Sequence, residues 1–351
     1  MAMYIKGMGC ISPQNSWDDN SLLSQPLIYE GDKLTCYEPD YAKYIEPKVL
    51  RRMSRIIKMG VTAGMMALKE ASLEIPNGII TGTAYGCLDD TGTFLNKMIE
   101  NSEQALNPTP FIQSTHNTIG SQIALLLQCQ GYNQTYTQGA FSFENALLDA
   151  MLALTDFPSQ SLLVGAVDEI TAVSHAIIRR FGIFRDGSNN LKLFTGTQNG
   201  TLHGEGAAYF ALSGYRVPTD RVCLEAIKMV FNPAYDSLRD QILSFLNRNG
   251  LAADDIDFIL LGKSGDKKHD VNTELISTSY FASSSVGMFK HLSGEYPTAS
   301  AFALWLSAKI MAENHIPDVV VVRNENRPIK RLLILNSYFG RQHSLILLRE
   351  C

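Results

Sequence analysis

The sequence contains no long apolar run, no block of like charges and no closely spaced pair of cysteines. Its apolar runs are short, such as Val319 to Val322, whereas about 20 apolar residues are needed to cross a bilayer. We therefore predict no membrane span. With 30 Lys and Arg against 35 Asp and Glu, and no basic cluster, nucleic-acid binding is not expected.

The 6 cysteines are scattered, without a C-x-x-C pair or a Cys/His spacing of the kind that binds zinc. They are Cys10, Cys36, Cys87, Cys129, Cys223 and Cys351. This pattern predicts reduced, mostly buried thiols, as in a cytoplasmic protein, and no metal site. The segment from Met1 to Ser12 has no basic stretch followed by an apolar run, so no export signal is expected.

Motifs for the common cofactors are missing as well. There is no G-x-G-x-x-G after a strand, no P-loop and no G-x-S-x-G elbow. The glycine-rich stretch 200–206, GTLHGEG, allows either a phosphate loop or a tight turn, and a turn or close packing is favoured. No cofactor is predicted.

What the sequence does contain is a regular alternation of strand and helix patterns over 351 residues, 45% of them apolar. Strands are predicted at 4–9, 79–85, 134–138, 161–166, 207–212, 222–230, 258–261, 319–322, 331–335 and 344–348. Helices are predicted at 51–72, 117–128, 142–154, 237–247 and 297–314. A polar stretch at 213–221 separates two similar passes, so we predict an α/β fold of two fused halves, 1–215 and 222–351.

Seven local patterns then follow one another in the order typical of one enzyme family. They are IKGMGCISP at 5–13, RMSR at 52–55, NPTPF at 107–111 with the polar residues after it, LVGAVD at 163–168, GTLHGEGAAYFAL at 200–212, HLSG at 291–294 and NSYFG at 336–340. Together they resemble the β-ketoacyl-acyl-carrier-protein synthase family of the thiolase superfamily. The resemblance implies two duplicated βαβαβαββ halves in an α-β-α-β-α layered architecture.

The chemistry of that family needs a particular set of residues. A cysteine at the N-terminus of a buried helix is favoured as a thiolate by the helix dipole and takes the acyl group as a thioester. Two histidines then polarise the malonyl thioester carbonyl, and backbone N–H groups hold the developing oxyanion.

The nucleophile is missing from this sequence. Alignment without gaps places Ala140 at the cysteine position, and a slip of one or two residues would place Gly139 or Gln138 there. No register supplies a thiol, because the flanking cysteines are Cys129 and Cys223. Ser142 lies two residues into the helix, with no general base placed for it.

The electrophilic groups are incomplete too. Gly262 takes the place of the first histidine, whereas the second is kept as His291. The family's lysine five residues before that histidine is Val286, and the glycine directly before it is Lys290. The last loop, 340–343, carries GRQH instead of glycines. We therefore expect the chain to be inactive in condensation on its own.

A kept fold with a lost cysteine resembles chain-length factors, the inactive subunits of ketosynthase heterodimers. The resemblance implies an active ketosynthase partner with the Cys-His-His set, and an acyl carrier protein that brings the chain. The small size resembles ketosynthase-like proteins of aryl polyene, flexirubin or dialkylresorcinol pathways. Residues expected at the interface or the acyl tunnel, unless they are simply core, are Ile112, His116, Ile119, Phe141, Phe339 and Gly340.

Two alternatives remain open. In one, Gln138 slips into the nucleophile position, as in related proteins where a glutamine there accompanies malonyl decarboxylation. In the other, the chain is a homodimer that binds acyl groups or acyl carrier protein without catalysis.

Overall fold

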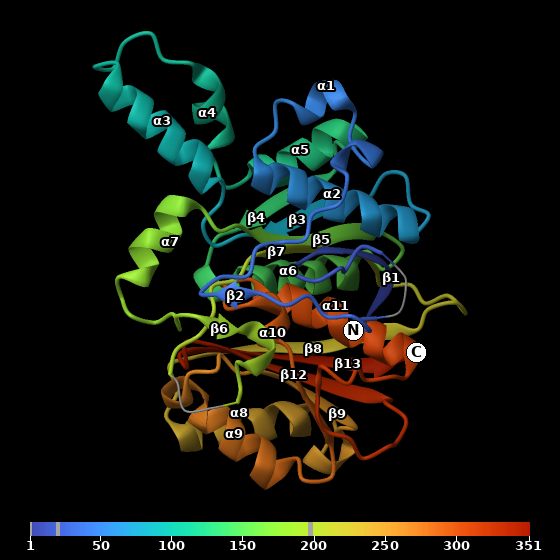
Figure 1. The fold of residues 1–351 in the computed structure, drawn as a ribbon. Helices are drawn as coiled ribbons and strands as arrows, with labels where there is room; N and C mark the ends of the chain where they lie inside the picture. Colours follow the sequence, from blue (N-terminus) through green and yellow to red (C-terminus); the bar gives the residue numbers. More distant parts are fainter. Residues whose placement is uncertain (1, 19–21, 196–198) are drawn as a thin grey trace.

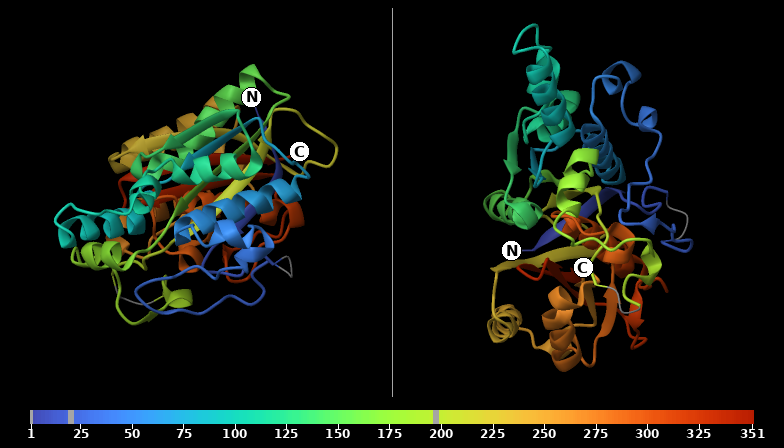
Figure 2. Two further views of the ribbon diagram at one scale, coloured as in Figure 1. Left: turned by 90° about the horizontal axis from the view of Figure 1, so that it is seen from above. Right: turned by 60° about the vertical axis from the view of Figure 1, so that its left-hand side comes forward.

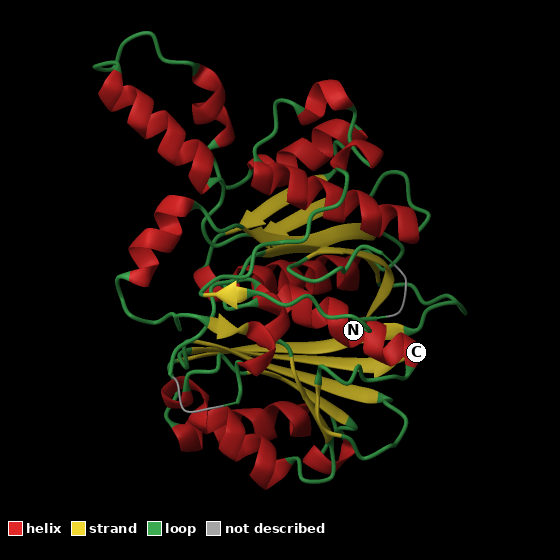
Figure 3. Ribbon diagram, viewed as in Figure 1, coloured by secondary structure: helices red, strands yellow, loops and turns green. Residues whose placement is uncertain are grey.

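The computed structural model describes residues 2–18, 22–195 and 199–351, and its centre is a large twisted sheet (Figures 1 and 3). Eleven strands are hydrogen-bonded in the order β11-β10-β9-β12-β13-β8-β1-β7-β5-β3-β4. From the N-terminus they are β1 (Met3–Ile11), β3 (Gly78–Gly82), β4 (Tyr132–Tyr136), β5 (Ser161–Asp168), β7 (Gly206–Ser213), β8 (Val222–Phe231), β9 (Phe258–Gly262), β10 (Ser285–Met288), β11 (Val321–Arg323), β12 (Arg331–Tyr338) and β13 (Gln342–Glu350). The strands β2 (Glu30–Gly31) and β6 (Ser188–Asn189) form a separate small ribbon.

The strand directions show that the two halves repeat one topology. In the first half β7 is antiparallel to both neighbours, β1 and β5, while β5, β3 and β4 are parallel. In the second half β13 is antiparallel to β8 and β12, while β12, β9 and β10 are parallel. The predicted duplication is therefore confirmed. Within the sheet the two halves are joined by a short pairing of β1 with β8. The exact limits 1–215 and 222–351 stay a prediction.

Helices form three layers around the two halves of the sheet (Figure 1). The outer helices are α2 (Arg55–Glu70) and α5 (Thr118–Leu127) on one side and α8 (Tyr235–Arg248) and α9 (Lys267–Tyr280) on the other. Between the sheet halves run α6 (Ser142–Asp156) and α11 (Ala299–Glu313). Helix α11 is apolar on nearly every side and almost wholly buried, as a helix in the middle layer must be.

Shorter and peripheral helices complete the chain. They are α1 (Pro47–Leu50), α3 (Leu88–Glu100), α4 (Pro108–Gln113), α7 (Ala172–Arg179), α10 (Lys290–Ser293) and the 3-10 turns η1 (Tyr41–Lys43), η2 (Gly139–Phe141), η3 (Asn190–Lys192) and η4 (Ala253–Asp255). The pair α3 and α4 projects from the body beside α5 (Figures 1 and 2). None of the described helices is long and apolar enough to cross a membrane.

The structure corrects several expected elements. The helix expected at 51–72 begins at Arg55, after the separate α1, and the strand expected at 134–138 lies at Tyr132–Tyr136. Helices α3, α4, α7 and α9 and strand β10 were not predicted. The first three lack a buried stripe, because none of their side chains is fully buried, and hydrophobic periodicity detects only helices that pack on a core.

Candidate functional site

The turn that leads into the middle helix α6 has no nucleophilic side chain. The chain leaves β4, makes the 3-10 turn η2 with Gly139 at φ +58°, and enters α6 at Ser142. The left-handed φ explains the glycine. Ala140 offers only a buried methyl group.

Ser142 is held within this turn. Its Oγ accepts a hydrogen bond from the backbone N–H of Gln138 (2.9 Å) and donates one to the carbonyl of Gly139 (2.8 Å). No described carboxylate or imidazole hydrogen-bonds to the hydroxyl. It caps the turn rather than attacking a thioester.

Gly262, at the end of β9, has no room for a side chain. It pairs with Asn336 of the parallel strand β12. A Cβ atom at position 262 would lie 2.2 Å from Oδ1 of Asn336 and 2.8 Å from its Cα. The loop beyond is tied down by Asp270, whose carboxylate accepts from the N–H groups of Ser264 and Gly265, each at 2.7 Å. The place expected for the first histidine is therefore filled by the protein itself.

His291 is present in α10 but its Nε2 is occupied. That atom donates to the carbonyl of Val319 at 2.7 Å, and the ring meets Phe194 edge-on. Burial lowers the pKa of His291 to about 4, so the ring is neutral near pH 7. Its Nδ1 has no hydrogen-bond partner among the described residues.

Lys290 stands where the family pattern has a glycine, and it forms a buried ion pair. Its Nζ donates to both carboxylate oxygens of Glu295 (2.8 and 2.9 Å) and to the carbonyl of Ser337 (2.6 Å). Both side chains of the pair are fully buried. Burial raises the pKa of Glu295 to about 7, and the adjacent Lys290 opposes that rise.

Further polar groups collect near this ion pair. The carboxyl of Glu144, in the first turn of α6, is fully buried, and burial raises its pKa to about 7. The charge of Lys290 partly offsets that rise. Neither carboxylate oxygen of Glu144 has a hydrogen-bond partner within the described ranges. The cluster is rich in charge but has no thiol.

The residues expected at an interface or tunnel fall into separate places. Ile112 of α4 is 66% exposed, whereas Ile119 of α5 packs against Gly60 within the chain's own core. His116 lies between α4 and α5, with its ring against Gly86. Ile112 is therefore exposed as an interface residue would be, whereas Ile119 is a core residue.

The other three expected residues surround the turn before α6. Phe141 is half-buried at the start of that helix. Phe339 and Gly340 form the turn from β12 to β13, with φ values of +47° and +66°. The side chain of Gln342, just beyond, lies close to Gly139. The structure thus brings the last loop and the altered nucleophile turn together.

Sequence reasoning missed the groups that fill the site. The roles of Asn336, Glu295 and Asp270 come from strand pairing and loop packing, which no local pattern reveals. Glu144 had one visible signal, a charged residue within the apolar run of a predicted core helix.

The duplicated halves, the five layers and the turn before a buried middle helix define a thiolase-like fold. The family model "Beta-ketoacyl synthase, N-terminal domain" matches residues 4–216, more than half of the chain, so the chain belongs to the β-ketoacyl synthase family.

Solved structures agree with this assignment. The ishigamide ketosynthase/chain length factor superposes with a TM-score of 0.82 at 17% identity, covering 99% of this chain and 98% of the other. A β-ketoacyl synthase from Burkholderia phymatum STM815 gives 0.80 at 15% identity, covering 100% and 99%. The type II polyketide ketosynthase AntDE, solved with its acyl-carrier protein AntF and bound to the hexaketide, gives 0.75 at 15% identity, covering 100% and 99%. A search of curated protein sequences found no match.

Proposed function

We propose that this chain is a non-catalytic, chain-length-factor-type subunit that pairs with an active β-ketoacyl-acyl-carrier-protein synthase in fatty acid or polyketide-type biosynthesis. The observation that carries the proposal is the turn before α6, where none of Gln138, Gly139 and Ala140 offers a thiol and Ala140 has only a buried methyl group. Without a thiol there is no thioester to extend.

The surroundings of that turn support inactivity independently. A histidine at position 262 would collide with Asn336, and the Nε2 proton of His291 is already donated to a backbone carbonyl. Restoring the cysteine alone would therefore leave the carbonyl of a malonyl thioester without its two polarising groups.

We propose that the edge of the sheet beside this turn is the surface for the partner. Among the described residues, strand β4 is hydrogen-bonded to β3 on one side, and no strand pairs with its other edge. Beside it Tyr132, Leu148, Leu152 and Phe157 are 48%, 36%, 62% and 58% exposed, and the hydroxyl of Tyr132 donates to Asp149 of α6. We call these four residues and the free edge the β4–α6 surface. An open edge with an apolar flank suits a subunit that adds its own strand.

The relatives support the kind of partner. One is a ketosynthase/chain length factor, and another was solved with an acyl-carrier protein. For this chain we therefore propose a cysteine-bearing ketosynthase as the subunit partner and an acyl carrier protein as the source of the growing chain. An aryl polyene or flexirubin-type pathway is the narrower version of the proposal.

The test is co-expression with a cysteine-bearing ketosynthase encoded in the same gene cluster. We expect a stable heterodimer that extends malonyl-carrier substrates, while this chain alone does nothing. Malonyl decarboxylation by this chain alone would instead support the decarboxylase alternative. A stable homodimer that ignores the ketosynthase would support the acyl-binding alternative.

A further inference from the structure

Two cysteines lie on one face of the strand pair β8 and β13. Cys223 is the second residue of β8, and the residue opposite it on β13 is Arg349. The N–H of Cys351, one residue beyond β13, donates to the carbonyl of Arg221 at 3.0 Å and so continues the same ladder. Side chains two residues apart on a strand point to one face, so Cys351 shares the face of Arg349 and Cys223. The two thiols are therefore diagonal neighbours.

Each of these thiols acts on the pKa of the other. Burial raises the pKa of Cys223 to about 12, and the negative charge of a Cys351 thiolate adds to this rise. Burial also raises the pKa of Cys351, while the thiol of Cys223 and the guanidinium group of Arg349 oppose that rise. Cys351 is partly exposed, whereas Cys223 is fully buried. An oxidant in solution therefore reaches Cys351 first, with Cys223 directly behind it.

The geometry allows a bridge after a small shift of the chain beyond β13. A disulfide needs Cα atoms within about 7 Å of each other, and diagonal neighbours on antiparallel strands lie about 7–8 Å apart. Strand β13 ends at Glu350. The movement of about 1 Å that closes this difference therefore falls on Cys351, outside the paired strand.

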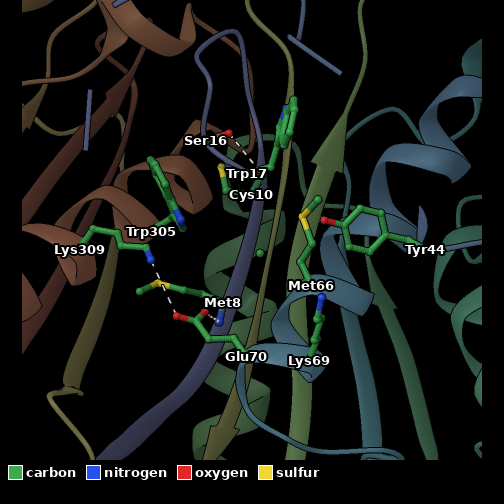
Figure 4. Close-up of a pocket in the computed structure, with 11 residues that line it drawn as sticks. Met8, Cys10, Ser16, Trp17, Tyr44, Met66, Lys69, Glu70, Trp305 and Lys309 are labelled. Atoms are coloured by element: carbon green, nitrogen blue, oxygen red, sulfur yellow. Dashed lines mark hydrogen bonds and ion pairs between the residues drawn. The ribbon is translucent and has the colours of Figure 1, made fainter. Parts of the chain in front are cut away.

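Cys10 and Cys36 also lie near each other and provide an internal comparison. Cys10 lines a pocket beside Ser16 and is 2% exposed (Figure 4). Sγ of Cys36 donates to the carbonyl of Glu205 at 3.6 Å. Burial and the charge of the Glu205 carboxylate raise the pKa of Cys36 well above its ordinary value. A thiol beside a carboxylate forms little thiolate, so this second pair should stay reduced.

We propose that Cys223 and Cys351 are a modification site that forms a reversible disulfide, with oxidised glutathione or a similar small disulfide as the oxidant. The sulfur of Cys351 attacks one sulfur of the oxidant, forms a mixed disulfide and releases one reduced thiol. The sulfur of Cys223 then attacks the sulfur of Cys351 and releases the second reduced thiol. Two protein thiols are oxidised, one small disulfide is reduced, and the two protons end on the released thiols.

The bridge ties the last strand of the second half to the first strand of that half. It goes beyond the pairing function and does not depend on it. Because it closes a long loop, it restricts the unfolded chain more than the folded one and should stabilise the protein.

Oxidation of the purified chain by oxidised glutathione tests the proposal. We expect the intact mass to fall by two hydrogen atoms, and digestion without reductant to give one cross-linked peptide that contains Cys223 and Cys351. The melting temperature should rise by roughly 3–10 °C, and dithiothreitol should reverse both changes. No reaction, a stable glutathione adduct on Cys351 alone, or a bridge between Cys10 and Cys36 overturns the proposal.

Single variants show which thiols are needed. Cys351→Ser and Cys223→Ala each leave one thiol of the pair and should abolish the bridge and the rise in melting temperature. Cys129→Ser is the matched control, because Cys129 is also partly exposed but its Sγ donates to the carbonyl of Pro76 at 3.2 Å. This variant should form the bridge as the parent does. An unchanged mass loss and stabilisation in Cys351→Ser contradict the assignment.

A measurement on the unaltered, reduced chain keeps the test decisive if a variant fails to fold. Dibromobimane becomes fluorescent when it joins two neighbouring thiols. We expect a fluorescent cross-link that maps to Cys223 and Cys351, and we expect prior treatment with oxidised glutathione to prevent it. A reduced chain in which these two residues are not joined shows that their thiols are too far apart, and the proposal then fails.

Discussion

The interior around the turn before α6 and the β4–α6 surface differ in whether their groups have partners within the chain. Inside, potential catalytic positions are filled or occupied: Asn336 fills the space at Gly262, and Lys290 is bound to Glu295. Outside, the edge of β4 is unpaired and its apolar neighbours face solvent. The contrast is what we expect if, as proposed, the chain associates with a partner and does not itself react.

Breaking the buried ion pair should have the largest effect. Lys290→Met leaves Glu295 buried without its cation, and removing one partner of a buried pair costs about 3–5 kcal/mol. We expect that loss in the free energy of unfolding measured by chemical denaturation. The double variant Lys290→Met with Glu295→Gln should recover part of it. If the single variant is as stable as the parent, the interior is less tightly specified than the structure implies.

Charging the outer surface should affect association and leave the fold intact. Leu152→Glu places a carboxylate in the β4–α6 surface, and a loss of about 2 kcal/mol or more in binding to the ketosynthase is expected for a central apolar contact. Val322, on the opposite edge strand β11, is 54% exposed and serves as the matched control. Equal loss of binding in Val322→Glu would place the partner elsewhere.

Filling the space at position 262 should destabilise the protein without creating activity. Gly262→Ala forces Cβ against Asn336, and overpacking of this kind costs about 1–3 kcal/mol. Gly92→Ala is the matched control, because a Cβ there meets nothing within 4 Å and replacing a helical glycine stabilises by up to about 1 kcal/mol. Similar melting temperatures for the two variants would show that position 262 has room after all.

The pH dependence of the free energy of unfolding tests whether Glu144 is buried and able to take up a proton. Burial raises the pKa of Glu144 to about 7, above its ordinary value of 4.5. The stability that this carboxyl contributes is therefore complete below pH 4.5 and is lost as pH rises through about 7. Glu144→Gln should flatten that fall by an amount on the order of 1 kcal/mol. Parallel stability profiles for parent and variant would contradict a buried, protonatable Glu144.

The sequence predicted the architecture well where hydrophobic periodicity was strong. Large apolar side chains such as Phe143 and Phe302 are stable only in the buried core. Their spacing therefore predicted the middle helices, the buried strands and the duplicated order. The exposed helices α3 and α7 were not predicted, because their apolar side chains, including Ile99 and Val173, remain at the surface. The apolar side chains of these two helices do not pack against a hydrophobic core.

The candidate site divides in the same way. The absence of a thiol between Cys129 and Cys223 can be seen from the residues alone. The reason that Gly262 excludes a histidine cannot, because Asn336 reaches it from a strand 74 positions later. Contacts between distant strands depend on register, which local patterns do not encode.

The most direct test of the central claim follows the acyl group within the assembled pair. The heterodimer is incubated with acyl-carrier substrate, and the intact mass of each subunit is then recorded. The account predicts that the cysteine-bearing partner alone gains the acyl mass, and that this chain stays unmodified while the pair extends the substrate. An acyl adduct on this chain, formed with or without the partner, would contradict the proposal that it is a non-catalytic subunit.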